Sequence, residues 1–136
     1  MIGSYRIFRL LAGPLVLCEF FVSSAVGQIK MEIFTCNIDG SDLRQITHLC
    51  KANWAPFFHP SGKKIIFSSN HDSPKGFHFN LFMTNLDGTG TEQITTESVF
   101  NAFPMFSPDG KKIVFSSNRN NHGTHDTNLF IADWEE

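Results

Sequence analysis

The sequence predicts an all-β protein, and two observations lead to this fold class. The first is an internal repeat: residues 53–70 (NWAPFFHPSGKKIIFSSN) return forty-eight positions later as residues 101–118 (NAFPMFSPDGKKIVFSSN), with twelve of eighteen positions identical. The second is that each period holds strand and turn signals, and no helical periodicity appears after residue 30. Strand-only repeats of this length are typical of propeller blades. We therefore expect a partial β-propeller of about two four-stranded antiparallel blades.

One complete period is expected to contain four short strands. Residues 60–62 (PSG) and 85–88 (NLDG) form turns, because proline presets φ at the second position of a type I turn and glycine accepts a positive φ. The continuous apolar run Ile65-Ile66-Phe67 indicates a strand that is covered on both faces. Connections this short allow only antiparallel pairing. The expected strands are residues 55–59, 64–69, 79–85 and 91–95.

The same offset divides the rest of the chain into incomplete blades. Residues 32–47 match the third and fourth strands of a blade, residues 53–96 form the complete blade, and residues 101–135 supply three strands of another. Since no fourth strand follows before Glu136, we expect the outer edge of the last strand to be unpaired. Residues 1–30 are assigned to a separate leader.

Three segments of these blades resemble a known family. SPDGKKIVFSSNRN, NLFMTNLDGTGTEQIT and NLFIADW look like the repeats of TolB-type β-propellers, which also resemble the propeller domains of prolyl oligopeptidase-like peptidases. The resemblance covers about residues 32–136 and implies a closed ring of about six blades. Because roughly two blades are present, it implies a C-terminal fragment of a longer protein, or self-association that completes the ring.

The leader has the features of a secretory signal. Arg6 and Arg9 precede an apolar stretch, and the small residues of 23–27 suggest cleavage near Gly27. This interpretation favours a periplasmic or secreted protein, with a cytoplasmic location as the alternative. A lipoprotein signal, a membrane anchor and unrelated sequence joined by truncation are the other interpretations, and Glu19 argues against a membrane span because it interrupts the apolar run.

Charge and cysteine content limit the possible partners. The formal net charge is −2 and the pI is near 6.3, so the chain has no basic footprint and nucleic acid is not an expected partner. Contact with a membrane is expected only through the N-terminal signal or anchor. Cys36 and Cys50 fall near opposite ends of their strands, too far apart for a disulfide.

Long polar loops predict a binding face at one end of the blades. In an up-and-down blade, the loop between the second and third strands and the link to the next blade emerge on the same side. Mixed His and Asp side chains could ligate a divalent metal there. The histidines do not recur at the repeat offset, however, so we favour polar linker loops and expect neither a metal nor a cofactor. The candidate residues are His48, His71, Asp72, His78, His122, His125 and Asp126.

No catalytic residues are predicted, and the chain is not expected to be an enzyme. It contains no Gly-x-Ser-x-Gly nucleophile motif, and Ser68-Ser69 recurs with the blade as Ser116-Ser117, which marks both pairs as structural. The resemblance implies a non-catalytic module that binds a protein or peptide in the cell envelope. The alternatives are the propeller portion of a prolyl oligopeptidase-like or polysaccharide-active enzyme without its catalytic residues, and a truncated gene remnant.

Overall fold

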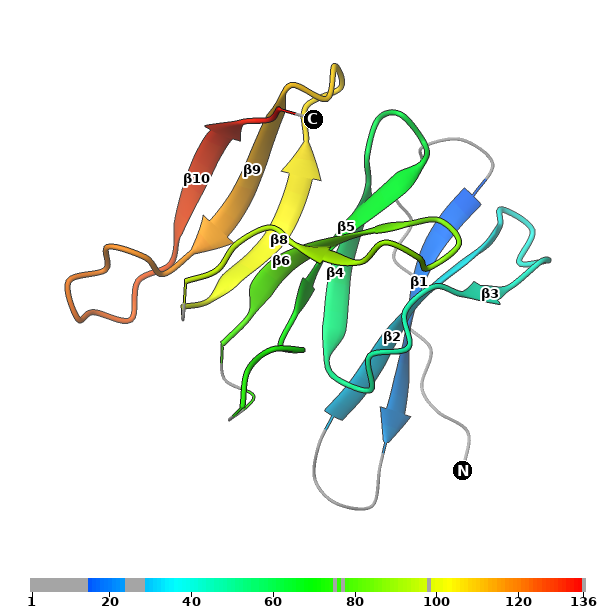
Figure 1. Cartoon of the computed structure of the whole chain (residues 1–136), viewed down its shortest axis with the longest axis horizontal. Helices are drawn as coiled ribbons and strands as arrows, with labels where there is room; N and C mark the ends of the chain where they lie inside the picture. Colours follow the sequence, from blue (N-terminus) through cyan, green and yellow to red (C-terminus); the bar gives the residue numbers. More distant parts are fainter. Residues whose placement is uncertain (1–14, 24–28, 75, 77, 98, 136) are drawn as a thin grey trace.

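The computed structural model describes residues 15–23, 29–74, 76, 78–97 and 99–135. These residues form ten strands in three antiparallel sheets (Figure 1). The described residues contain no helix, and so none that is long and apolar enough to cross a bilayer. The all-β fold class predicted from the repeat is confirmed.

The central sheet is the complete four-stranded blade expected from one period. Its strand order is β4-β5-β6-β7, so each strand pairs with its neighbour in sequence. The second strand has the predicted bounds. The fourth was expected over residues 91–95 but has only two residues, which form two ladder pairs with β6. The strands are β4 (Asn53–Phe58), β5 (Lys64–Ser69), β6 (Asn80–Asn85) and β7 (Glu92–Gln93).

The last sheet repeats the central sheet in register. It contains β8 (Asn101–Phe106), β9 (Lys112–Ser117) and β10 (Asn128–Asp133) in the order β10-β9-β8. Every pair between β5 and β6 has a counterpart between β9 and β10 at the offset of forty-eight. Both first strands also carry a β-bulge with a residue of positive φ, Ala55 at 51° and Phe103 at 55°. Recurrence of this uncommon conformation marks the bulge as part of the blade.

The first sheet contains one more strand than the sequence analysis predicted, and it begins before residue 32. β1 (Leu15–Ser23) lies within the segment assigned to a separate leader, yet it pairs with β2 (Ile29–Asn37) over its whole length, and β3 (Arg44–Gln45) follows. Its aromatic and β-branched residues suit a strand, and β2 offers an edge that needs a partner. Arg6, Arg9 and the expected cleavage site near Gly27 lie outside the described residues.

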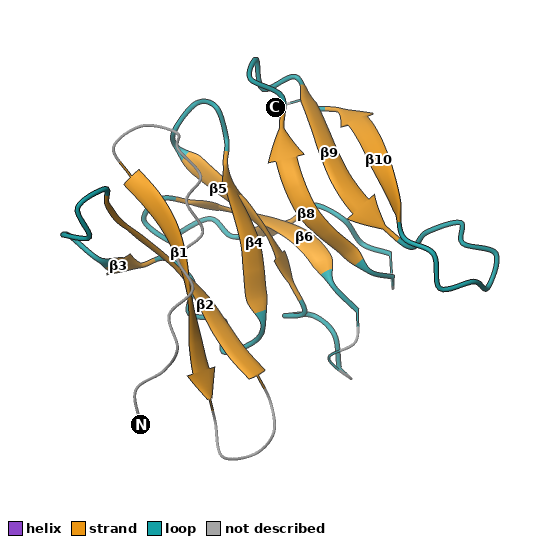
Figure 2. Ribbon diagram, turned by 180° about the vertical axis from the view of Figure 1, so that it is seen from behind, coloured by secondary structure: helices purple, strands orange, loops and turns teal. Residues whose placement is uncertain are grey.

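The three sheets stand side by side (Figure 2). Two apolar clusters hold them together. One cluster joins Ile33 and Ile46 of the first sheet to the central sheet, and the other joins the central sheet to Phe106 and Phe115 of the last. The central strand β5 is therefore covered on both faces, as its continuous apolar run predicted. Its residues Ile65, Ile66 and Phe67 are all fully buried.

The outer face of the last sheet lacks this cover. Leu129 is 74% exposed and Ile131 is 72% exposed, whereas Leu81 and Met83 at the same places in the central sheet are 0% and 2% exposed. The difference arises because the last sheet packs against the central sheet on one side and against no further sheet of the described residues on the other. An exposed apolar patch of this kind is typical of an interaction surface.

The tight turns follow the predicted chemistry. Gly88 has a φ of 80°, and its amide donates to the carbonyl of Asn85 (2.9 Å). Asp87 in this turn accepts hydrogen bonds from the hydroxyl (2.6 Å) and the amide (2.9 Å) of Thr89, and Asp39 accepts the same pair from Ser41. These hydrogen bonds favour the ionised carboxylates and lower the pKa of both aspartates.

Replacement of Gly88 by alanine should destabilise the protein more than the same change at Gly40, its counterpart in the first sheet. Both glycines have a positive φ, which costs alanine roughly 1–2 kcal/mol. Only at position 88 would the new Cβ meet another group, at 2.5 Å from the carbonyl oxygen of Ile46, which adds about 1–3 kcal/mol of overpacking. Urea unfolding of both variants measures the difference, and equal losses would contradict a tight contact between the blades.

The pKa of Asp87 should rise toward its ordinary value of 3.8 when Thr89 is replaced by valine. Because folding depresses this pKa, the stabilisation from ionised Asp87 is complete above the unfolded value and is lost as the pH falls through the folded value. An NMR titration of the carboxyl groups measures both aspartates, with Asp39 as the unchanged internal control. An Asp87 pKa that does not respond to the substitution would show that the Thr89 hydroxyl is not the cause.

Candidate functional site

The predicted binding face lies at the end of the sheets opposite the β4–β5 and β8–β9 turns, which we call the loop end. It consists of the link 46–52, the loop 70–79 and the loop 118–127 (Figure 1). All three segments leave the sheets on this side because strand direction alternates through each antiparallel blade.

A small polar pocket of about 130 Å³ lies at the loop end of the central sheet. Two of the candidate residues, Asp72 and His78, line it. The pocket is smaller than the roughly 300–1,000 Å³ usual for drug-sized ligands. Its size suits one side chain of a partner or a small polar group. The lining residues are Ser69, Asp72, Ser73, Pro74, His78, Asn80, Gln93 and Thr96.

Hydrogen bonds from the strand ends position the pocket loop. Ser69, at the end of β5, donates its hydroxyl to Asn53 Oδ1 (2.6 Å) and accepts the amide of His71 (3.0 Å). The hydroxyl of Ser73 accepts the amide of His78 (3.2 Å), which closes the loop around the pocket. Ser69 is buried and its hydrogen bonds are structural, as its recurrence in the repeat predicted.

The other candidate residues lie at the same end and do not line the pocket, although His71 is next to Asp72. His71 Nε2 is 3.7 Å from Asp72 Oδ1, and both side chains are exposed. Thr124 donates its hydroxyl to Asp126 (2.7 Å) within the loop 118–127. His48, His122 and His125 are exposed. In the part of the chain that the structure describes, no three His, Cys, Asp or Glu side chains are arranged to hold a metal ion.

A buried polar group at the boundary of the first and central sheets was not predicted. Glu32 of β2 is 5% exposed, and its carboxylate accepts hydrogen bonds from the Thr47 hydroxyl (2.6 Å), the Cys50 amide (2.7 Å) and the Asn53 side chain (3.1 Å). These donors satisfy the oxygens of the buried carboxyl group. Asn53 also donates to the carbonyl of Met31 (2.9 Å), so the first strand of one blade holds the third strand of the preceding blade.

The next boundary repeats this arrangement with neutral groups. Asn80 replaces Glu32, and its side-chain amide lies 2.9 Å from Thr95 Oγ1 and 3.1 Å from Asn101 Nδ2. Asn101 is fully buried and accepts the Ser117 hydroxyl (2.9 Å), as Asn53 accepts that of Ser69. The repeat offset linked these positions in the sequence, but the change from Glu to Asn concealed their common role.

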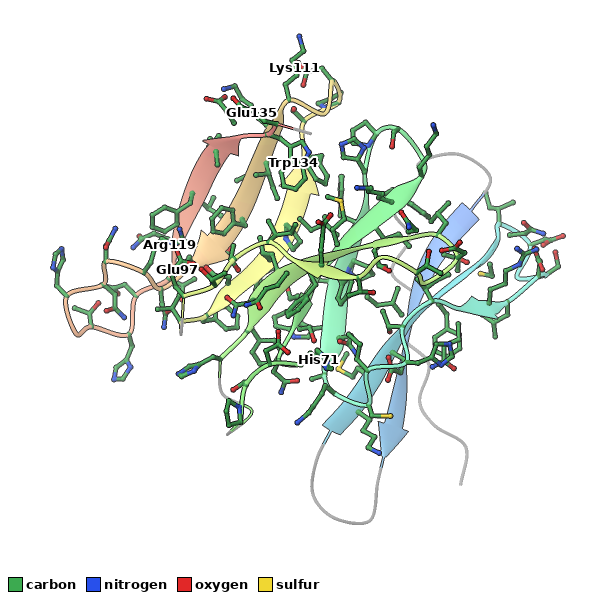
Figure 3. The ribbon with its side chains drawn as sticks, viewed as in Figure 1. His71, Glu97, Lys111, Arg119, Trp134 and Glu135 are labelled. Carbon is green, nitrogen blue, oxygen red and sulfur yellow. The ribbon has the colours of Figure 1, made fainter. Side chains whose placement is uncertain are left out.

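Arg119 is a second residue that the sequence analysis did not single out. It occupies the place of His71 in the last sheet, and its guanidinium lies 5.0 Å from the Phe115 ring and 5.4 Å from the Phe130 ring. It donates to Asn101 Oδ1 (2.9 Å) and Ser117 Oγ (3.1 Å). Figure 3 shows Arg119 beside Glu97 at the loop end, while Trp134 and Lys111 lie at the opposite end of the last sheet.

Antiparallel blades that repeat at a fixed offset and pack face to face define a β-propeller protein. The chain belongs to the TolB β-propeller domain family, whose model matches residues 21–125. No curated protein matches the chain in sequence.

Solved structures share the fold at low sequence identity. A TolB of Agrobacterium tumefaciens superposes with a TM-score of 0.61 at 18% identity, over 86% of this chain and 57% of that one. TolB of Acinetobacter baumannii superposes with a TM-score of 0.63 at 22% identity, over 86% of this chain and 27% of that one. The β-propeller domain of the Trilobed protease of Pyrococcus furiosus is described as having an open velcro topology. It superposes with a TM-score of 0.69 at 19% identity, over 98% of this chain and 40% of that one. The chain thus spans less than two thirds of the length of each of these proteins.

Replacement of Arg119 by methionine should destabilise the protein by about 1–3 kcal/mol, because it leaves Asn101 and Ser117 with fewer hydrogen-bond partners. Glu97→Gln is the matched control. It removes only a partly exposed ion pair (3.3 Å) and should change stability by less than about 0.5 kcal/mol. Chemical unfolding of both variants gives the comparison. Losses of equal size would mean that the ion pair, not the contacts with the blade, accounts for the effect of Arg119.

Proposed function

We propose that this chain is a non-catalytic propeller module that binds a protein or peptide in the cell envelope through its loop end. The observation that carries the proposal is the polar pocket around Asp72 and His78, which is too small for a typical organic substrate and is open to a partner's side chain. Membership of the TolB family supports the envelope location.

The blades would act as part of a larger ring. The exposed Leu129 and Ile131 support this part of the proposal, because the same positions in the central sheet are buried by a neighbouring blade. The additional blades would come from a longer protein or from further copies of this chain. Burial of such a face stabilises the assembly by about 25 cal/mol of free energy per Å² of apolar area, before the entropic and desolvation costs of association are subtracted.

The alternative function is the propeller portion of an enzyme. The fold shared with the Trilobed protease propeller over 98% of this chain favours it. Such a module would control access to catalytic residues on another domain. It would also bind peptides, so the two functions differ in whether hydrolysis accompanies binding.

Site-specific photo-crosslinking in the host cell tests the loop end as the binding surface. A photoreactive residue at His71 should give an adduct with a second protein in the envelope fraction. The same photoreactive residue placed at Ser61 should give no adduct, because Ser61 is exposed in the β4–β5 turn at the opposite end. Loss of the His71 adduct in the double variant Asp72→Ala, His78→Ala would assign it to the pocket. Equal adducts from both positions, or none from His71, would refute binding at the loop end.

A further inference from the structure

A short segment with the sequence Gln-Ile-Thr covers the outer edge of the third strand in two of the three sheets. Residues 45–47 cover β2 of the first sheet and residues 93–95 cover β6 of the central sheet. The residues just before them differ, Arg44 in one copy and Glu92 in the other. The shared interaction therefore does not depend on the identity of the residue before the pattern.

Both copies bind one third-strand residue through its amide and its carbonyl. In the central sheet, the amide of Ile94 donates to the carbonyl of Leu81 (2.7 Å), and the amide of Leu81 donates to the hydroxyl of Thr95 (2.9 Å). In the first sheet, Ile33 takes the place of Leu81, and both distances are 2.8 Å. The threonine hydroxyl thus replaces the backbone carbonyl that an ordinary neighbouring strand would offer.

The glutamine and isoleucine have defined roles in the segment. The Gln93 side chain donates to the carbonyl of Thr95 (2.7 Å), and Gln45 makes the same bond to Thr47 (2.7 Å), which fixes the shape of the segment. Ile94 packs against the cluster that contains Leu81, as Ile46 packs against that of Ile33. An aliphatic residue between a glutamine and a threonine therefore completes the interaction.

The third strand of the last sheet has the same edge without this cover. Leu129 pairs with Ser116 as Leu81 pairs with Ser68, so its amide and carbonyl also face away from the neighbouring strand. The sheet order places β10 at an edge, and no strand of the described ranges pairs with its outer side. Asn128, the counterpart of the Asn80 that contacts Thr95, is exposed.

We propose that the outer edge of β10 binds an extended segment of another polypeptide with the pattern Gln-aliphatic-Thr. The amide of Leu129 donates to the threonine hydroxyl, and its carbonyl accepts the amide of the aliphatic residue. The aliphatic side chain covers Leu129, which is 74% exposed. This is peptide recognition by addition to a sheet edge. It involves a different surface from the loop end and does not depend on the proposed function.

A synthetic peptide with the sequence of residues 88–96 (GTGTEQITT) tests the proposal in an NMR titration of the ¹⁵N-labelled chain. So few contacts give weak binding, with a dissociation constant in roughly the high micromolar to millimolar range. We expect saturable shifts of the Leu129 and Ile131 amides while the Leu81 amide is unchanged. The matched peptide with valine in place of the threonine at position 95 should bind at least about tenfold more weakly, since it lacks the hydroxyl.

Leu129→Pro removes the outward amide from the chain itself. Proline is tolerated on an edge strand when its missing amide faces away from the sheet, so pairing with β9 should survive and the melting temperature should change little. We expect this variant to lose peptide binding. If the Leu129→Pro variant unfolds, the difference in binding between the threonine peptide and the valine peptide still tests the proposal.

Three results would overturn the proposal: no saturable shift with the parent peptide, equal binding of the valine peptide, or undiminished binding to folded Leu129→Pro. The His71 adduct should persist in Leu129→Pro, because the His71 ring lies against Phe82 of the central sheet and not against β10. The two proposals can thus fail independently.

Discussion

Cover on both faces of each apolar sheet is the constraint on which the rest of this structure depends. A strand such as β5, with Ile65, Ile66 and Phe67 in succession, presents apolar side chains to both sides. One neighbouring sheet cannot bury them, and a helix on either side would need a longer connection than the repeat contains. Stacked sheets of similar sequence satisfy the constraint, and the fixed offset of the repeat follows from it.

Polar groups set the order of the stacked sheets once apolar packing brings them together. Asn53 and Asn101 each stand at the start of a blade, are fully buried, and reach the third strand of the blade before. A buried amide without partners is costly, so a displaced or reversed neighbour would lose several hydrogen bonds at once. Apolar contact supplies most of the stabilisation, and these amides select one arrangement.

The repeat made part of the fold predictable from the sequence, although the bulges at Ala55 and Phe103 also recur and were not predicted. Turns at Gly62 and Gly88, the bounds of β5 and the register of the last sheet were accessible because two copies agreed. β1 was missed because its residues do not match the repeat and its apolar stretch follows Arg6 and Arg9, which favoured a secretory signal. It also pairs with β2 one residue out of step with the offset. The role of Glu32 was missed because its partners are 15 to 21 residues away and its counterpart Asn80 is uncharged.

The amides at the blade boundaries also determine the symmetry of any assembly. Each blade donates hydrogen bonds from the Asn at the start of its first strand to the third strand of the preceding blade. Its own third strand accepts such bonds from the following blade, so its two faces differ. A twofold dimer would place like faces together and would not repeat the contacts that Asn53 and Asn101 make across the boundaries within the chain. A contact that continued this order between copies would be heterologous, joining the leading face of one copy to the trailing face of the next. Such contacts either close into rings or continue into filaments, and the rotation between successive blades decides which of the two forms.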